Sequence, residues 1–198
     1  DIDGVLDLQG TGSSSSAAEF YSTRSFIPVS VVTTIRGSVI VSGNNAKVQA
    51  GNSTPVFENG SQLIYTRNGG GCPRANFKDG SIIKIQGVTT IPTSFNSSAV
   101  YDGVIEWDCP AQTIAGSSAL LLPSSSFNYF DSLVIINTGI GSSVRLATNP
   151  SGYYVKNIVI SGGILEFASP GGSGAYTCRV DNVHQTGGTL IGNAPGTA

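Results

Sequence analysis

A pattern that occurs twice near the C-terminus, 25 residues apart, constrains the fold of this chain more than any other feature. The first copy reads SGYYVKNIVISGGILEF (151–167) and the second reads AYTCRVDNVHQTGGTLIG (175–192). The copies align at these positions: Val155 with Val180, Asn157 with Asn182, Val159 with His184, Gly162-Gly163 with Gly187-Gly188, and Leu165 with Leu190. A period of about 20 to 30 residues, with strand, glycine turn and strand in each unit, is typical of stacked β-coils. The pattern predicts an all-β chain folded as a β-solenoid, similar to a right-handed β-helix.

The pattern of short strands and turns continues through the middle of the chain, where residues typical of helices are nearly absent. Asn59-Gly60, Asp79-Gly80 and Asp102-Gly103 each precede a short apolar alternation, and such dipeptides supply the positive φ angles of tight turns. Asn137-Thr138-Gly139 lies 24 residues before Ser161-Gly162-Gly163 and indicates an earlier, degenerate coil. A β-sandwich or jelly roll, with strands every 8 to 12 residues, gives a similar texture and is the alternative fold.

The first nine residues, DIDGVLDLQ, form a strand-like segment among acidic residues, with the apolar positions Ile2, Val5, Leu6 and Leu8. A Gly- and Ser-rich stretch follows as far as residue 16 and predicts a flexible linker. We expect residues 1–16 to form an N-terminal strand or cap with its linker, and residues 17–198 to form one all-β domain. The strand has two interpretations: it folds back on its own domain, or it is a donor strand that completes a neighbour's sheet.

The composition excludes several classes of function. Charged residues make up 11% of the chain, against about 25% in ordinary domains, and the net charge is −2. The ten Lys and Arg do not cluster, so the charge footprint of a nucleic-acid-binding protein is missing. No apolar run reaches the roughly 18 residues of a membrane span.

The chain begins at Asp1 without an apolar signal core, as in a mature secreted protein or a trimmed fragment. We expect an extracellular, cell-surface or virion-surface location.

Three cysteines, Cys72, Cys109 and Cys178, lack the spacing of a zinc site. Cys72 and Cys109 each precede a proline in a turn-like setting, and a disulfide between them is one prediction. Three buried free thiols are the alternative. No metal site is predicted from these residues.

The carboxylates of Glu106 and Asp108 are the one candidate for catalytic chemistry. On a strand both would point to one face, roughly 7 Å apart, with Ile105 and Trp107 on the other face. Two carboxylates at that distance could act as acid and base in glycoside cleavage. The interpretation that we favour is a solvated strand face with Trp107 in the core. We therefore predict no catalytic residue and no enzymatic activity.

Binding chemistry is equally sparse. Calcium is the one cofactor that the residues could hold, either at Glu106 and Asp108 or at Asp1, Asp3 and Asp7, although the complete EF-hand spacing is missing. His184, the only histidine, takes the place of Val159 in the repeat and is predicted to be a structural residue at an inward or stacking position. The tyrosines could bind sugar rings or pack on the sheet. These candidates are Tyr129, Tyr153 and Tyr154.

The signature N-x-x-x-x-G-G-x-L lies in both copies of the repeat, within residues 130–192. This segment resembles the coils of β-helical extracellular surface proteins, such as filamentous-haemagglutinin-type adhesins and phage tailspikes. The resemblance implies a rod-like protein that faces carbohydrate or another surface. Our first hypothesis is an extracellular structural or adhesive protein that self-associates into a fibre through its N-terminal strand. The alternative is a module that binds or cleaves surface glycans, as tailspikes do.

Overall fold

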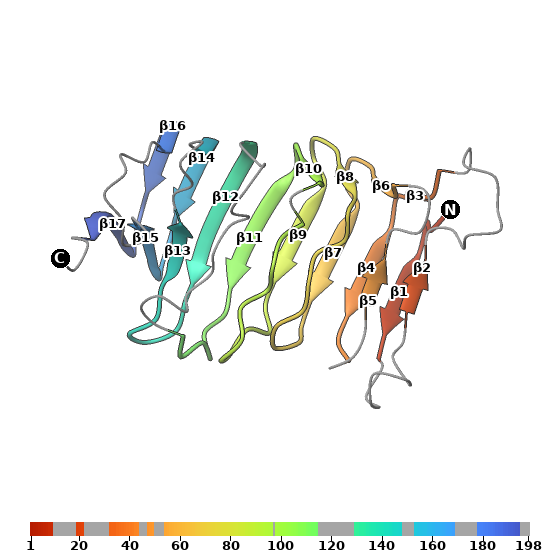
Figure 1. Ribbon diagram of the computed structural model, residues 1–198, viewed down its shortest axis with the longest axis horizontal. Coiled ribbons are helices and arrows are strands. Elements are labelled where there is room, and N and C mark those ends of the chain that lie inside the picture. The colour runs from red at the N-terminus through yellow and green to blue at the C-terminus, as the bar shows by residue number, and fades with distance from the viewer. Residues whose placement is uncertain are drawn as a thin grey trace.

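The chain is a β-solenoid built from parallel strands. The computed structural model describes residues 1–9, 19–21, 32–43, 47–49, 54–96, 98–114, 129–147, 153–168 and 178–194. Within these ranges all regular structure is β-strand, and every pair of strands is parallel. The strands follow one another along the molecule, and the first and last described strands lie at opposite ends (Figure 1). The solenoid prediction is confirmed, and the sandwich alternative is wrong because its sheets would be antiparallel.

One long sheet runs the length of the molecule, and smaller sheets complete the coils. The long sheet contains, in spatial order, β1 (Val5–Leu8), β4 (Ser38–Val41), β7 (Gln62–Tyr65), β9 (Ile82–Ile85), β11 (Val104–Asp108), β12 (Tyr129–Asn137), β14 (Tyr153–Ile160) and β16 (Cys178–Gln185). The smaller sheets contain β3 (Thr34–Ile35), β6 (Val56–Phe57), β8 (Asn76–Phe77) and β10 (Val100–Tyr101); β13 (Val144–Ala147), β15 (Ile164–Ala168) and β17 (Thr189–Ala194); and β2 (Glu19–Tyr21) with β5 (Lys47–Gln49).

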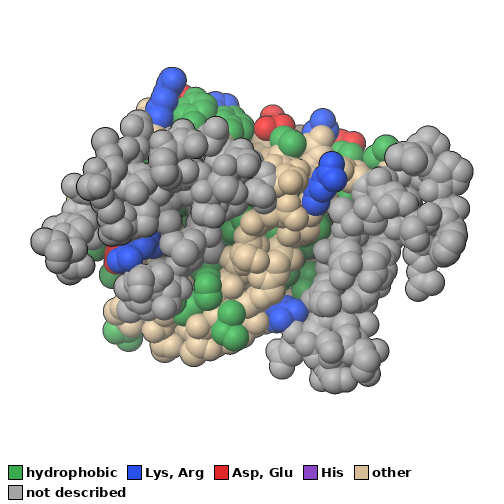
Figure 2. All heavy atoms as spheres, in the orientation of Figure 1, with side chains coloured by type: hydrophobic (Ala, Val, Ile, Leu, Met, Phe, Trp, Pro, Cys, Tyr) green, Lys and Arg blue, Asp and Glu red, His purple; other side chains and the backbone are tan. Residues whose placement is uncertain are grey.

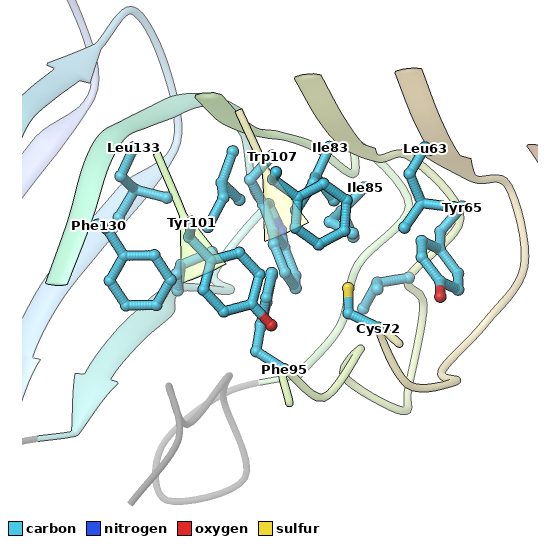
Figure 3. Packing of buried hydrophobic residues seen from close by; sticks show 14 of the residues in the cluster. Leu63, Tyr65, Cys72, Ile83, Ile85, Phe95, Tyr101, Trp107, Phe130 and Leu133 are labelled. Carbon is cyan, nitrogen blue, oxygen red and sulfur yellow. The ribbon is translucent and has the colours of Figure 1, made fainter. Parts of the chain in front are cut away.

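Two columns of inward side chains run through the long sheet, because parallel pairing places equivalent positions of successive strands beside each other. The first column is Leu6, Val39, Leu63, Ile83, Ile105, Leu133, Ile158 and Val183, and the second is Leu8, Val41, Tyr65, Ile85, Trp107, Ile135, Ile160 and Gln185. The members of both columns from β4 to β14 are at most 2% exposed. The core is therefore continuous along the molecule, as its middle part shows in Figure 3.

A row of aromatic rings forms part of the same core. The ring centroids of Phe57 and Phe77 are 4.6 Å apart, those of Phe77 and Tyr101 are 5.5 Å apart, and those of Tyr101 and Phe130 are 5.3 Å apart. Each ring is almost completely buried. Because successive coils contribute one ring each, the aromatic contacts also tie neighbouring coils together.

The predicted repeat aligns residues as the structure does. Val155 pairs with Val180 and Asn157 with Asn182 between β14 and β16, and Leu165 pairs with Leu190 between β15 and β17. The double glycines lie where successive coils approach closely. A Cβ on Gly187 would meet the carbonyl oxygen of Ser161 at 2.3 Å. These glycines are needed because a side chain would push the coils apart.

The positive φ angle predicted for the glycines of the three turns is found at two of them. Gly60 and Gly80 have φ angles of 80° and 76°, as expected for tight turns. Gly103 is not among the glycines with positive φ. It is needed for space instead, since a Cβ there would lie 2.4 Å from the Ser81 hydroxyl oxygen and 2.5 Å from the Ser81 carbonyl oxygen.

The N-terminal strand folds back on its own chain. β1 pairs in parallel with β4, with Leu6 beside Val39 and Leu8 beside Val41, and Ile2 forms a bridge with Ile35. β1 is thus the first strand of the long sheet. The predicted Gly/Ser linker, residues 10–16, lies outside the described residues.

Candidate functional site at the two ends of the sheet

The outer strands of the long sheet, β1 and β16, each have an edge that no other described strand pairs with. One type of backbone hydrogen bond recurs along the sheet. The carbonyl of an inward residue accepts a hydrogen bond from the next strand, where the donor is the N–H of the residue that follows its register partner. Ser42 donates in this way to Leu8 at 3.1 Å, and Thr186 donates to Ile160 at 2.9 Å. Inward residues therefore direct their backbone groups toward the next strand, and outward residues direct theirs toward the preceding strand. The free edge of β16 presents Val183 and Gln185, and the free edge of β1 presents Val5 and Asp7.

Apolar side chains are exposed at both ends of the sheet. Val183 is 49% exposed, whereas Ile158, its partner on β14, is 1% exposed. At the other end Val5 is 72% exposed, and Leu6 is only partly buried against the core. Exposed strand edges with apolar side chains are templates for pairing with another strand. The two ends of the long sheet are thus surfaces with which another β-strand can pair.

Acidic residues surround β1. Asp1 and Asp3 lie 3.5 Å and 3.1 Å from the guanidinium of Arg36. The carboxylate of Asp7 accepts hydrogen bonds from the side chains of Gln9 and Ser42, which hold the pKa of Asp7 below its usual value. Within the described ranges, no three His, Cys, Asp or Glu side chains come together as a metal site. Of the carboxylates that were considered for calcium, Asp1, Asp3, Asp7 and Glu106 contact side chains of the same chain.

His184 lies on β16 beside Val159 of β14, as the repeat predicted. Its expected inward direction is wrong: Val159 is only half-buried between the buried Ile158 and Ile160, and His184 is exposed. The cause is a break in the alternation of β14, where two consecutive residues after the buried Val155 face outward. His184 therefore projects from the outer face at the end of the sheet.

Glu106 and Asp108 lie on the outer face of β11, and Ile105 and Trp107 are buried on the inner face. The Glu106 carboxylate lies 4.0 Å from the Lys84 ammonium group, and both side chains are about one quarter exposed, at 28% and 27%. The favoured interpretation, a solvated strand face with Trp107 in the core, agrees with this arrangement. Glu106 thus forms a cross-strand ion pair with Lys84 on the outer face of the sheet.

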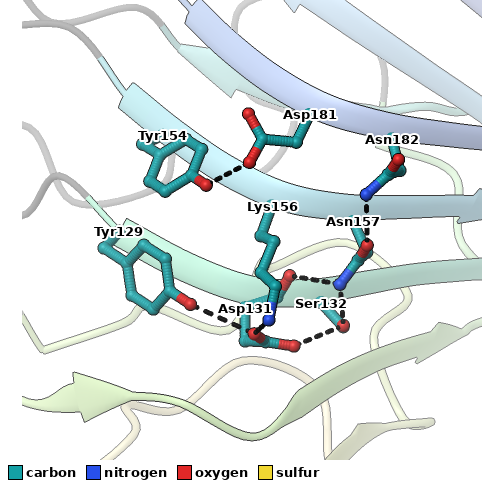
Figure 4. Close-up of polar contacts among 8 residues, drawn as sticks. All are labelled: Tyr129, Asp131, Ser132, Tyr154, Lys156, Asn157, Asp181 and Asn182. Atoms are coloured by element: carbon teal, nitrogen blue, oxygen red, sulfur yellow. Dashed lines mark hydrogen bonds and ion pairs between the residues drawn. The ribbon is translucent and has the colours of Figure 1, made fainter.

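A polar cluster covers the outer face of β12, β14 and β16 (Figure 4). The rings of Tyr129 and Tyr154 lie side by side, with centroids 5.3 Å apart. Asp131 accepts hydrogen bonds from Lys156 at 2.9 Å and from the Tyr129 hydroxyl at 3.1 Å. The Tyr154 hydroxyl donates to Asp181. The side chain of Tyr153, the third tyrosine candidate, lies outside the described residues.

Sequence reasoning missed most of this cluster, although the 25-residue period extends to it. Tyr129, Tyr154 and Arg179 are spaced by that period, and the Arg179 guanidinium lies 4.9 Å from the centre of the Tyr154 ring. The charged positions with the same spacing are Asp131, Lys156 and Asp181. Alternating charge in one column gives each rung an attractive neighbour. The 25-residue spacing of these side chains is visible in the sequence, but it begins in the coil that precedes the two copies of the repeat.

Amides continue the cluster along the sheet. Asn182 donates to the side-chain oxygen of Asn157 at 3.0 Å, and Asn157 donates to the Ser132 hydroxyl at 3.3 Å. Ser132 in turn donates to Asp131 at 2.8 Å. The polar groups of this face are largely satisfied by one another, which suits a role in holding coils in register.

The three cysteines are free thiols in the structure, so the disulfide predicted between Cys72 and Cys109 is not formed. Cys109 donates to the carbonyl of Ile85 at 3.3 Å, and burial raises its pKa to about 12. Burial also raises the pKa of Cys72, which packs near Tyr65 in the core (Figure 3). These two residues behave as small apolar core side chains, the alternative that the sequence left open.

Comparison with family models, with curated proteins and with solved structures finds no match to this chain. Across the described ranges, no helix has the length and apolar character needed to cross a membrane.

Proposed function

We propose that this protein is an extracellular structural or adhesive rod whose copies join end to end. The observation that carries the proposal is the pair of free strand edges, on β1 and β16, with exposed apolar side chains at both. A second copy can satisfy the backbone groups of one edge with those of the other, and it covers both apolar ends at once. The extracellular location is supported by the low charge and the small polar residues of the chain.

The surface between the ends supports the same function. In the described part of the face shown in Figure 2, charged side chains of both signs stand singly or in small groups among uncharged side chains. The net charge of the chain is −2, so the repulsion between approaching copies is weak. Long-range electrostatic repulsion therefore does little to oppose contact between the ends of two copies.

The N-terminal strand joins the copies in this proposal, but not as a donor strand. β1 is already paired with β4 in its own chain, and its outer edge is the part that remains open. Joining through that edge keeps the internal pairing intact. No strand has to leave its own sheet before a neighbour can bind.

Electron microscopy and light scattering on the purified chain test the proposal. Val183→Lys places a charge on the exposed end column, and we expect it to convert filaments or large oligomers into monomers. Ile136→Lys is the matched control, because Ile136 is 39% exposed in the interior strand β12. The control should assemble like the unmodified chain. A monomeric unmodified chain, or equal assembly of both variants with intact circular dichroism spectra, contradicts the proposal.

Saccharide binding is a second candidate function, favoured by the two neighbouring tyrosine rings and the carboxylates beside them. Aromatic faces and paired polar groups are the usual means of holding a sugar ring. A glycan array with the unmodified chain should show binding that Tyr129→Ala weakens at least tenfold. Glu106→Gln, on the neighbouring strand β11, should leave this binding unchanged. No binding across a broad glycan panel would remove this candidate.

A further inference from the structure

We infer that successive copies join in the same strand register that runs within each copy, so that Asp7 of one copy lies beside His184 of the next. This inference rests on the proposed end-to-end function and adds to it a defined register and a defined pair of contacts. It follows from three properties of the two edges: their backbone groups, their columns and their side chains.

The backbone groups of the edges are complementary. Along the sheet, Ser42 donates to Leu8, Thr66 to Val41 and Gln86 to Tyr65, at distances between 2.8 and 3.2 Å. The same bond at the junction would run from the N–H of Gln9 to the carbonyl of Gln185. The free backbone groups of β1 belong to its outward residues, and those of β16 belong to its inward residues. The same combination joins all the other neighbouring strands of the sheet, so the two edges can form the same hydrogen bonds.

The columns also continue across the junction. Each column begins on β1 and ends on β16, so extending it by one strand determines which residues meet. The junction pairs are Val5 with Asn182, Leu6 with Val183, Asp7 with His184, and Leu8 with Gln185. The exposed Val183 is then covered by an apolar side chain, as every other member of its column is.

The pair formed by Asp7 and His184 selects this register over its neighbours. A slip of one residue turns the apolar residues of β1 to the outer face. A slip of two residues separates Asp7 from His184 and places Leu6 either beside the polar Gln185 or beside Asp181, which lies on the outer face. The Asp7 carboxylate is an acceptor, and the exposed imidazole of His184 supplies an N–H donor in either protonation state. Only the continuous register brings these two groups together.

Cysteine cross-linking tests the register directly. Val5→Cys and Asn182→Cys, combined in a chain with Cys178→Ser, leave Asp7 and His184 in place. In the continuous register their Cα atoms are about 5 Å apart, within the range of a disulfide. Oxidation should give a ladder of reducible multimers on a gel. The control, Val5→Cys with Thr186→Cys, places the second cysteine four residues further along the exposed end and should give at least tenfold less cross-linked product.

Charge exchange tests the contact itself. Asp7→Lys should weaken assembly at least tenfold in the concentration required, and adding His184→Asp to that variant should restore it. Two outcomes would overturn the register if filaments still form: equal cross-linking of both cysteine pairs, or no rescue by charge exchange. Either outcome would leave the proposed end-to-end function unaffected. The absence of any assembly from the unmodified chain overturns both.

Discussion

Glycine positions decide how closely the coils can stack, and one loop contains a matched pair. Gly139 and Gly141 have nearly equal φ angles of 75° and 71°. A Cβ on Gly141 would meet nothing within 4 Å, whereas a Cβ on Gly139 would lie 2.1 Å from the carbonyl oxygen of Gln112. We expect Gly141→Ala to cost about 1 kcal/mol of unfolding free energy, from φ alone, and Gly139→Ala to cost about 3 kcal/mol or more. Urea unfolding measures both, and equal losses would contradict the close contact.

Trp107 is held by a buried hydrogen bond that alternation could not predict. Its indole N–H donates to the Gln112 side-chain oxygen at 2.8 Å, and Gln112 donates to the Ser143 carbonyl at 2.9 Å. Trp107→Phe leaves this buried acceptor without its donor and removes part of a core ring. The expected loss of stability is about 2–4 kcal/mol in chemical denaturation. Glu106→Gln, on the outer face of the same strand, is the control and should change stability by less than about 0.5 kcal/mol.

The sequence was sufficient for some side-chain directions and not for others. Strict alternation on β11 correctly placed Trp107 inside and Glu106 outside. The same reasoning failed for His184, because alternation breaks after Val155 and its register partner Val180 lies in an equivalent coil. A bulge that is repeated in successive coils leaves the register unchanged, so the aligned repeat gave no sign of it.

Among the strands, β12 and β14 are linked by an ion pair whose strength depends on pH. Burial raises the pKa of Asp131, but hydrogen bonds from Lys156, Ser132 and Tyr129 outweigh that effect and lower it below its usual value. A lowered folded-state pKa gives stability that is complete above the unfolded-state pKa, about 3.9, and is lost as the pH falls through the folded-state value. We expect Asp131→Asn to destabilise the chain at pH 7 by roughly 0.5–1 kcal/mol. Unfolding measured at pH 7 and pH 2.5 should show the difference shrinking in acid. A constant difference would contradict the linkage.

The register of the last coils was predictable because their spacing is constant, and that of the first coils was not. Partners on β12, β14 and β16 are 25 residues apart, as Ser132, Asn157 and Asn182 show. Earlier partners are 24 residues apart between Ser38 and Gln62 but 20 between Gln62 and Ile82. Loops of different length absorb these differences without changing the ladder, so the strands remain in register while the repeat disappears from the sequence.

For the whole molecule, stability should vary with position along the rod. Interior strands such as β9 and β11 have a neighbour on both sides, whereas β1 and β16 have one described neighbour each. In a stack of this kind, stability is approximately a sum of coil and interface contributions, and the ends open first. Hydrogen exchange should be fastest in β1 and β16 of the monomer and slowest near β9 and β11. Assembly should slow exchange in the two end strands alone. Uniform exchange along the chain would contradict this gradient.

The parallel stacking also determines how the molecule responds to force. The ladder hydrogen bonds of the long sheet point from strand to strand, and the outer strands β1 and β16 lie at opposite ends of that row (Figure 1). Tension between the ends therefore loads the bonds one coil after another instead of all together. A coil that opens releases a chain of 25 residues in the repeat region. Extended at roughly 3.4 Å per residue, this length is about 85 Å, against about 4.8 Å that the coil occupied in the stack. A fibre of such rods would yield in discrete steps, dissipating a pull while the remaining coils stay intact.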